Sequence, residues 1–284
     1  MNLDKREQQA VAHARNLLIE ASVWDLDNDL NCLVDRFLVR ANKERALDEF
    51  MLAVNERCNR IPLGHIVGAV EFDELPLVVG SGVFIPRPHS IVIHKWLDDA
   101  QLEKGARVFD LCAGSGAIGL AIARRRPDLG VTCVEFDEVA VRYLNRNIAR
   151  MAVKGIQVNA LQADIRDTSA FSRFTGQIAL IVANPPYVPQ GLELLPEWSS
   201  HHPQASVYSG ADGLDLTRQI IALAVDLLLP QGWLVIEHGE GQAQAMRQLF
   251  ERHKLTEVQT VIDHAASDST GSSVMTVGRL STDC

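Results

Sequence analysis

The segment Asn184-Pro185-Pro186-Tyr187 combines residue types that can hold a planar nitrogen group. It follows an apolar run at residues 178–183, IALIVA, which predicts a buried strand. The two prolines end the strand, lack N–H donors and keep the chain extended. The Asn184 amide and the Pro185 carbonyl can then hydrogen-bond to an NH2 group, and Tyr187 provides an aromatic face for stacking. We expect a clamp for such a group at the carboxyl edge of a sheet, where open α/β folds bind ligands; the alternative is an ordinary polar loop.

A glycine-containing turn forms the second candidate site. Its sequence, DLCAGSG at residues 110–116, follows a predicted strand and precedes a predicted helix. Gly114 and Gly116 allow a ligand to approach the backbone closely, and the first turn of the helix presents unpaired N–H groups. The turn does not read G-x-G-x-x-G, because Cys112 stands at the first glycine position. The Asp110 carboxylate would repel a pyrophosphate and attract a cation, such as the amino and sulfonium groups of S-adenosylmethionine.

Two further carboxylates follow the next predicted strands. Glu135 is placed to accept hydrogen bonds from the two ribose hydroxyls of a nucleoside. Asp164 can accept from an adenine amine, while Ile165 packs on the ring. One such carboxylate is usually a solvated loop residue, but three at successive strand ends predict a single site for S-adenosylmethionine. The predicted cofactor-binding residues are Asp110, Cys112, Ala113, Gly114, Ser115, Gly116, Glu135, Asp164, Ile165 and Asn184.

This pattern indicates methyl transfer to a planar nitrogen by a class I S-adenosylmethionine-dependent methyltransferase, with S-adenosylhomocysteine as the product. An amide nitrogen is a poor nucleophile, because its lone pair is delocalised into the carbonyl. Asn184 and Pro185 would hold its two hydrogens and aim the nitrogen, with Tyr187 as the third catalytic residue, so orientation would replace a strong base. No Ser-His-Asp or Cys-His arrangement is evident. The adjacent His201 and His202 are typical of polar surface, so we expect no metal.

The elements that must position these residues can be read from hydrophobic periodicity. Beyond residue 90 the chain alternates strands and helices, which predicts an α/β fold with a parallel sheet. The predicted strands are 107–112, 131–135, 156–161, 178–183 and 233–238, with an edge hairpin at 258–262 and 274–277. The predicted helices of this part begin after the glycine turn and run further through 138–152, 216–229 and 242–253, with a turn at 230–232.

The first third of the chain has a different texture. Residues 1–60 show helical spacing three times, and residues 60–88 contain two short apolar runs with a turn at Gly80-Ser81-Gly82. We expect a helical domain at 1–68, a β-hairpin linker at 69–90 and a catalytic domain at 91–284. The helices either recruit a partner or only pack as an accessory. Arg87, held between two prolines, either faces the site or caps the next helix.

Composition narrows the classes of partner. The chain has 284 residues, a formal net charge of −9 and five scattered cysteines without a CxxC pair. No apolar run is long enough to cross a membrane and the start is polar, so we expect a reduced, cytoplasmic protein without membrane contact. An acidic balance lowers the expectation of a nucleic acid partner, because neutralisation of phosphates dominates such binding.

Nearly the whole chain resembles the protein glutamine methyltransferase family. The resemblance lies in IPLGHIVGAVEFDELPLVVGSGVFIPRP, DLCAGSGAIGLAIA, VANPPYVP, YSGADGLDLTRQII and GWLVIEHGEGQ. It implies a seven-stranded, Rossmann-like methyltransferase domain behind a small helical domain and a hairpin linker. It also implies that residues 112–116 and Glu135 hold S-adenosylmethionine. The substrate would be a glutamine side chain of a class 1 peptide release factor or of a large-subunit ribosomal protein, held by residues 184–187, with Arg87 as a further contact.

The sequence departs from the family pattern in places that surround substrate entry. Cys112 replaces a glycine that release-factor enzymes usually have, and Ile165 replaces an aromatic residue. The loop WSSHHPQASVY has His202-Pro203 instead of an acidic-proline pair, and the segment DHAASDSTGSSVMTVGR lacks the arginine that the family often has before the last strand. These departures motivate one alternative, a methyltransferase for a small nitrogenous metabolite (an amide, guanidine or amine). Two further alternatives are an adenine methyltransferase acting on nucleic acid, because adenine also offers an exocyclic NH2 group to the Asn-Pro-Pro-Tyr segment, and a binding module without activity.

Overall fold

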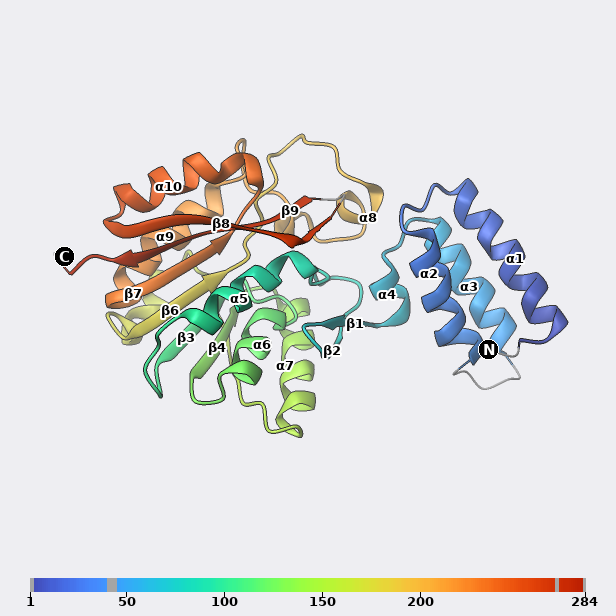
Figure 1. Cartoon of the computed structure of the whole chain (residues 1–284), viewed down its shortest axis with the longest axis horizontal. Coiled ribbons are helices and arrows are strands. Elements are labelled where there is room, and N and C mark those ends of the chain that lie inside the picture. Colours follow the sequence, from blue (N-terminus) through green and yellow to red (C-terminus); the bar gives the residue numbers. More distant parts are fainter. Residues whose placement is uncertain (1–2, 40–44, 269–270, 283–284) are drawn as a thin grey trace.

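Seven strands form one mixed sheet in the order β5-β4-β3-β6-β7-β9-β8 (Figure 1). This computed structural model describes residues 3–39, 45–268 and 271–282. The strands from β3 to β7 are parallel, whereas β9 pairs antiparallel with β7 and β8 with β9. The bounds are β3 (Arg107–Leu111), β4 (Gly130–Glu135), β5 (Asn159–Gln162), β6 (Ile178–Ala183), β7 (Leu228–Glu237), β8 (Leu255–Asp268) and β9 (Gly271–Leu280). The predicted α/β class with an antiparallel edge pair is confirmed.

Helices cover both faces of this sheet because its strands are apolar on both sides. Val108, Leu180 and Val182 join a core with α5, α6 and α7, whereas Phe109 and Ile181 join a second core with α9 and α10. The bounds are α5 (Ile91–Asp99), α6 (Ala117–Arg125), α7 (Glu138–Ala152), α8 (Pro196–Ser199), α9 (Asp215–Leu227) and α10 (Ala243–Arg252). Short 3-10 segments are η2 (Pro88–Ser90), η3 (Thr168–Phe174), η4 (Gln204–Ser206) and η5 (Glu240–Gln242). All parallel strands therefore end at one edge of the sheet.

The helical region lies beside the α/β part and has a core of its own (Figure 1). It contains α1 (Lys5–Glu20), α2 (Leu26–Val34), the π-helical segment η1 (Asp35–Val39) and α3 (Ala46–Cys58). Helix α1 begins with a capping box, in which Asp4 accepts from the Glu7 N–H at 2.9 Å and the Glu7 carboxylate accepts from the Asp4 N–H at 2.8 Å. Leu18, Leu33 and Phe50 are completely buried between the three helices.

The linker differs from the prediction in its first strand. Residues read as the start of the first strand form a short helix, α4 (Leu63–Val67), and the hairpin consists only of β1 (Ala69–Phe72) and β2 (Leu75–Val78). The predicted turn at Gly80-Ser81-Gly82 is present after β2, where the Val83 N–H donates to the Gly80 carbonyl at 3.3 Å. The two strands of the hairpin are joined by a different turn, at Asp73-Glu74. Both turn residues have left-handed backbones, with φ of 46° and 62°. Two consecutive residues of this kind match the twist of a tight hairpin, so the turn works without glycine.

The end of the sheet also departs from the predicted boundaries. Strand β7 begins at Leu228, so the predicted turn at 230–232 lies inside the strand. Gln231, with φ of 65°, accommodates the irregular register between β6 and β7 there. Both edge strands are longer than predicted, because β8 and β9 continue to pair beyond the apolar segments from which they were inferred.

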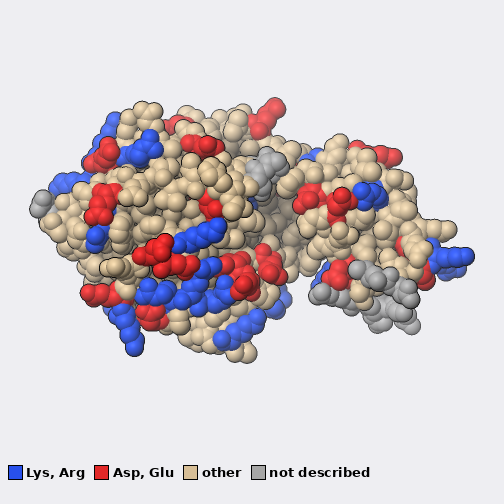
Figure 2. All heavy atoms as spheres, viewed as in Figure 1, with Lys and Arg blue, Asp and Glu red and all other residues tan. Residues whose placement is uncertain are grey.

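Two properties of the whole surface bear on partners. Among the described residues, no helix is long and apolar enough to span a membrane. On the face shown in Figure 2, basic side chains lie among acidic ones. Among the described residues, opposite charges form ion pairs such as Arg125 with Asp98 at 2.8 Å and Lys95 with Asp263 at 2.5 Å. Basic groups are therefore partly neutralised by acidic neighbours.

Candidate functional site

A cavity of about 670 Å³ opens at the carboxyl ends of β3, β4 and β6. This volume is within the range of about 300–1,000 Å³ that is usual for small-molecule sites. The predicted site residues that line the cavity are Arg87, Cys112, Ala113, Gly114, Ser115, Glu135, Asp164, Ile165, Asn184, Pro185, Pro186 and Tyr187. The glycine turn and the Asn-Pro-Pro-Tyr segment therefore share one cavity. Asp110 and Gly116 are the two predicted residues that do not line it.

Asp110 supports the glycine turn from beneath instead of facing a ligand. Its side chain is completely buried, and its Oδ2 accepts from the Gly119 N–H in the first turn of α6 at 2.8 Å. Burial raises the pKa of Asp110 to about 7, against the opposing effect of that hydrogen bond. Gly119 is needed for this packing, because a Cβ there would lie 2.3 Å from the Cys133 sulfur. The expectation that Asp110 attracts the cofactor directly is therefore corrected: the carboxylate anchors α6 to β3.

The turn itself uses left-handed backbone at three positions. Gly114 and Gly116 have φ of 55° and 86°, and Cys112 has φ of 60°. A left-handed residue with a side chain costs roughly 1–2 kcal/mol, which explains why a glycine would be favoured at position 112. A Cβ on Gly114 would meet no atom within 4 Å, so the space in front of this residue is open to a ligand.

Glu135 is held rigidly at the end of β4. Its Oε2 accepts from the Gly114 N–H at 2.8 Å, and its Oε1 accepts from the Phe136 and Asp137 N–H groups at 2.9 Å. Burial raises the pKa of the carboxyl, and these backbone hydrogen bonds oppose the rise. The side chain is therefore fixed against the glycine turn, and its Oε2, which accepts from one N–H only, retains lone-pair capacity for a further donor.

Asp164 and Ile165 lie on the same wall but in different environments. The Asp164 carboxylate pairs with Arg166, whose Nη2 lies 2.5 Å from Oδ2, and this contact is the main reason why the pKa of Asp164 is lowered. Ile165 is 7% exposed and belongs to the core on the α9 side of the sheet. The pair thus presents a charged edge beside an apolar surface, which is the combination expected for an adenine.

Asn184 belongs to a buried hydrogen-bond chain that the sequence did not reveal. Its Nδ2 donates to the Ser90 Oγ at 3.1 Å, and the Ser90 hydroxyl donates to the Glu237 Oε2 at 2.5 Å. Strand pairing explains the proximity, because Ala183 of β6 is opposite Ile236 of β7 and the next residue of each strand is Asn184 or Glu237. Among the described residues, none donates a hydrogen bond that would occupy the Asn184 Oδ1. Burial, more than any other cause, raises the pKa of Glu237 to about 7.

The backbone of Tyr187 is fixed by two later motifs. Its carbonyl accepts from the Gln242 Nε2 at 2.8 Å, and the same side chain accepts from the Gly239 N–H at 2.9 Å. A Cβ on Gly213 would lie only 2.1 Å from the Tyr187 carbonyl oxygen, so this position must remain a glycine. Burial raises the pKa of the Tyr187 hydroxyl, which is neutral at physiological pH.

The Arg87 side chain lines the cavity and makes no capping hydrogen bond, although Arg87 is the N-cap residue of η2. Its guanidinium lies over the ring of Trp198, 4.9 Å from the centroid, and its Nη2 is 3.3 Å from the His89 Nε2. The Trp198 ring also stacks on His202, with centroids 5.0 Å apart and planes inclined by 19°. Among the described residues, no group of three side chains could hold a metal ion.

The cavity fits S-adenosylmethionine on several independent points. The open space at Gly114 can accept a ligand chain, and the Ser115 hydroxyl is buried at the cavity wall without a hydrogen-bond partner among the described residues. Glu135 supplies a rigid carboxylate for ribose hydroxyls, and Ile165 supplies an apolar surface for a ring. An unpaired hydroxyl in such a place is typical of a group that is satisfied by a ligand.

Sequence reasoning missed Ser90, Glu237 and Gln242 as parts of the site. Ser90 directly precedes α5, but its hydroxyl bonds to Glu237 instead of capping that helix. A glutamate at the end of an otherwise apolar strand, WLVIEH, was the available signal for Glu237. For Gln242 no signal existed apart from its place in the GEGQ motif.

Solved structures with low sequence identity share this fold. The catalytic domain of hMettl16, solved in complex with MAT2A 3'UTR hairpin 1, has a TM-score of 0.56 at 13% identity, over 85% of this chain and 82% of that chain. A methyltransferase from Pyrococcus furiosus has a TM-score of 0.50 at 16% identity, over 73% and 89% of the two chains. At such identities the likeness shows the fold alone. Fold and site together define a class I S-adenosylmethionine-dependent methyltransferase.

Sequence comparisons identify the family within this class. The model of the methyltransferase small domain matches residues 90–194. The release factor glutamine methyltransferase of Mycolicibacterium smegmatis is 40% identical over 195 residues, 69% of this chain and 68% of that protein. The one of Corynebacterium glutamicum is 38% identical over 207 residues, 72% of each chain. The chain belongs to the release factor glutamine methyltransferase family. Both matches span less of the chain than the near-complete resemblance inferred from its motifs.

Proposed function

We propose that this protein methylates the side-chain amide nitrogen of a glutamine in a class 1 peptide release factor. The observation that carries the proposal is the orientation of Asn184, whose Nδ2 donates to Ser90 in the cavity that also contains the glycine turn. This leaves the Oδ1 as an acceptor for the NH2 group of a substrate amide. The names of the relatives from Mycolicibacterium smegmatis and Corynebacterium glutamicum support the choice of substrate.

The cofactor would be held by the turn at residues 112–116 and by Glu135. S-adenosylmethionine, when bound, supplies a methyl group on a sulfonium that is open to nucleophilic attack. Glu135 would accept from the ribose hydroxyls, while Asp164 and Ile165 would hold the adenine by its amine and its ring face. Asp110 would act indirectly, by holding α6 and hence the turn.

Asn184 and the Pro185 carbonyl would accept the two amide hydrogens of the substrate, and Tyr187 and Pro186 would border its plane. The substrate nitrogen would take the methyl group that the cofactor supplies and would then release one proton to solvent. Fixed acceptors stabilise the positive charge that develops on the nitrogen, which is why orientation can replace a strong base. Arg87 would contact the substrate from the Trp198 wall.

The proposed division of labour follows the predicted regions. Residues 1–68 would recruit the release factor, and residues 91–284 would catalyse the methyl transfer. Residues 69–90 would link these two domains. Class 1 release factors act on ribosomes, so the reaction would take place in the cytoplasm.

The test is transfer of labelled methyl groups to purified, unmethylated class 1 release factor. A large-subunit ribosomal protein and a pool of small amides, guanidines and amines serve as parallel substrates. Label on a glutamine of the release factor, located by mass spectrometry, is the expected result. Label only on the ribosomal protein or in the small-molecule pool would refute the proposed substrate.

The role of Asn184 is tested with Asn184→Ala. Removing a fixed acceptor for the developing charge should lower kcat by roughly 10²–10³-fold. The dissociation constant for S-adenosylmethionine, measured by calorimetry, should change by less than about threefold, because the glycine turn and Glu135 are intact. Asn145→Ala, at an exposed position on α7, is the matched control. Equal losses of activity and cofactor affinity would contradict the assignment.

A further inference from the structure

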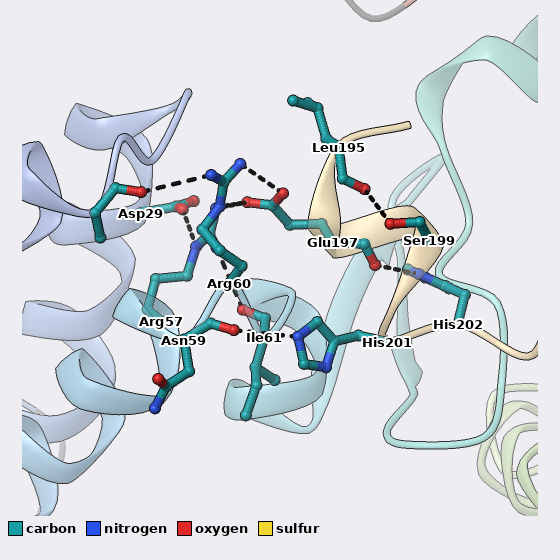
Figure 3. A network of polar contacts seen from close by, with 11 residues as sticks. Asp29, Arg57, Asn59, Arg60, Ile61, Leu195, Glu197, Ser199, His201 and His202 are labelled. Atoms are coloured by element: carbon teal, nitrogen blue, oxygen red, sulfur yellow. Dashed lines mark hydrogen bonds and ion pairs between the residues drawn. The ribbon is translucent and has the colours of Figure 1, made fainter. Parts of the chain in front are cut away.

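A small helix links the helical region to the wall of the cavity. Helix α8 carries Glu197, which is only 4% exposed although its partners come from residues about 140 positions earlier in the chain. Figure 3 shows this carboxylate between the side chains of Arg57 and Arg60. Its Oε1 accepts from the Arg57 Nη2 at 2.8 Å and from the Arg60 Nε at 2.7 Å, and its Oε2 accepts from the Arg60 Nη2 at 2.7 Å.

The charges of this network are balanced within the protein. The Arg57 Nε also donates to the Asp29 Oδ2 at 2.5 Å, so two guanidinium groups face two carboxylates. Burial would raise the pKa of Glu197, but hydrogen bonds from Arg60 and Arg57 outweigh it and lower this pKa. Glu197 is therefore ionised, and moving it away would leave a buried charge without its partner.

Arg60 occupies a backbone position that usually belongs to glycine. It follows the end of α3 with φ of 64°, and the Ile61 N–H closes the turn on the Glu56 carbonyl at 3.2 Å. Glycine is the common residue at this point of a helix end, because it has no Cβ. The bidentate contact of Arg60 with Glu197 offers a reason for a long side chain in a strained place.

The network continues from Glu197 to the cavity. The Glu197 carbonyl accepts from the His202 Nδ1 at 2.8 Å, and the Ile85 N–H donates to the His202 Nε2 at 3.3 Å. This pattern requires a neutral imidazole, and burial lowers the pKa of His202 to about 4. The His202 ring stacks on Trp198, which lines the cavity beneath Arg87. The place where this chain has His202-Pro203 is thus an uncharged support for Trp198.

We infer that Glu197 is a positioning residue that, through its ion pairs with Arg57 and Arg60, holds Trp198 as a fixed wall of the substrate entrance. The helical region then shapes the site as well as any surface for recruitment. The inference rests on the proposed function in one respect, that the segment entering beside Trp198 belongs to a release factor. A loose wall would weaken binding of this segment and leave the cofactor end of the cavity unchanged.

The test uses Arg60→Gln and Arg60→Lys in the full chain. Arg60 is the best position to change, because Arg57 still pairs with Glu197 and with Asp29 after its removal. Arg60→Gln should raise KM for unmethylated class 1 release factor about tenfold, with kcat changed less than about twofold and cofactor affinity unchanged. Arg60→Lys should lie between this variant and the wild type, because an ammonium cannot form the bidentate contact.

The matched control is Arg15→Gln in the same helical region. Arg15 forms an exposed ion pair with Asp27 at 2.7 Å, and neither residue lines the cavity. The KM of Arg15→Gln for the release factor should equal that of the wild type. An unchanged KM in Arg60→Gln, or a loss confined to kcat, would overturn the inference.

A second measurement decides the inference without any substrate. Iodide quenching of Trp198, isolated by subtracting the fluorescence of Trp198→Phe variants, should increase in Arg60→Gln and not in Arg15→Gln. Quenching that stays unchanged would also overturn the inference. Failure of the wild type to methylate the release factor would instead refute the proposed function, and the quenching result would still stand.

Discussion

At the scale of single residues, the two ends of the Asn184 amide have opposite hydrogen-bonding roles. The Nδ2 donates to Ser90 and Ser90 donates to Glu237, so the chain of donors ends on a carboxylate. This direction is favoured when Glu237 is ionised, because a carboxylate can only accept hydrogen bonds. A protonated Glu237 can donate to Ser90, and Ser90 can then donate to the Asn184 carbonyl, which reverses the amide and turns a donor toward the substrate.

This reversal predicts how activity depends on pH. Because burial raises the pKa of Glu237 to about 7, kcat should rise as the pH increases through about 7. In Glu237→Gln the rate should be lower and should lack this rise, since the amide cannot ionise. The measurement is kcat between about pH 6 and pH 8 with saturating release factor. Glu251→Gln, on the exposed side of α10, is the control, and a rise that persists in Glu237→Gln would contradict the explanation.

At the scale of elements, the sequence alone was enough to predict that a residue lies at the cavity when that residue follows a parallel strand. Glu135, Asp164 and Asn184 follow parallel strands, and such strand ends meet at one edge of the sheet. The position of a residue along a strand does not show the direction of its side chain. Asp110 was therefore predicted to contact the cofactor, although its carboxylate lies beneath α6. Nor does this position show the register of β6 and β7, which brings Glu237 to Asn184.

The boundaries of short elements were harder to predict for a related reason. Helix α4 has five residues, too few for helical spacing to differ from that of a strand. The hairpin turn at Asp73-Glu74 lacks glycine, whereas a glycine pair stands nearby at Gly80 and Gly82. Contacts support the actual turn: Asp73 accepts two hydrogen bonds from Arg125 of α6, each at 2.9 Å. Tertiary contacts of this kind leave no pattern in the local sequence.

The packing of the glycine turn against α7 leads to a prediction for Gly116→Ala. Gly116 has φ of 86°, and a Cβ there would lie 2.5 Å from the Leu144 Cδ1. The substitution should lower the free energy of unfolding by more than about 1–2 kcal/mol, the usual cost of a left-handed residue. It should also weaken S-adenosylmethionine binding, since the turn or the buried Leu144 side chain beneath it must shift to admit the Cβ. Gly155→Ala, with φ of 81° and no atom within 4 Å, isolates the backbone cost. Equal cofactor affinity in both variants would contradict this account.

At the scale of the whole molecule, buried acids and buried histidines have opposite effects on how the free energy of unfolding changes with pH. Burial lowers the pKa of His94 and His202 to about 4, so the unfolded chain binds more protons below 6.5 and stability falls as the pH decreases toward 4. Burial raises the pKa of Asp110 and Glu237 to about 7, so their contribution is complete near pH 4 and is lost as the pH rises through 7. The two effects have opposite slopes in the same range.

The substitution Asp110→Asn should remove the contribution of one buried acid to the pH dependence of stability. The pKa of Asp110 is about 7 in the folded protein, and 3.8 is the ordinary value of an aspartate. The wild type therefore gains stability from Asp110 as the pH falls from 7 to 3.8, and the variant does not. The difference in the free energy of unfolding between the two proteins should therefore grow with acidity, by about 1.4 kcal/mol for each pH unit. Urea unfolding at several pH values measures it. Asp99→Asn, at an exposed position, should run parallel to the wild type; parallel curves for Asp110→Asn would refute the expectation.

The contact between α3 and α8 has a consequence for the order of events during synthesis. Arg57 and Glu197 are 140 residues apart, so the first three helices leave the ribosome long before their acidic partner exists. Asp29 is already present and can pair with Arg57, which lets the helices fold around their own core. The ion pairs with Glu197 can form only after strands β3 to β6 have been made. These ion pairs therefore cannot join the helical region to the Trp198 wall before about the first two thirds of the chain have been synthesised, while strands β7, β8 and β9 are still to be added.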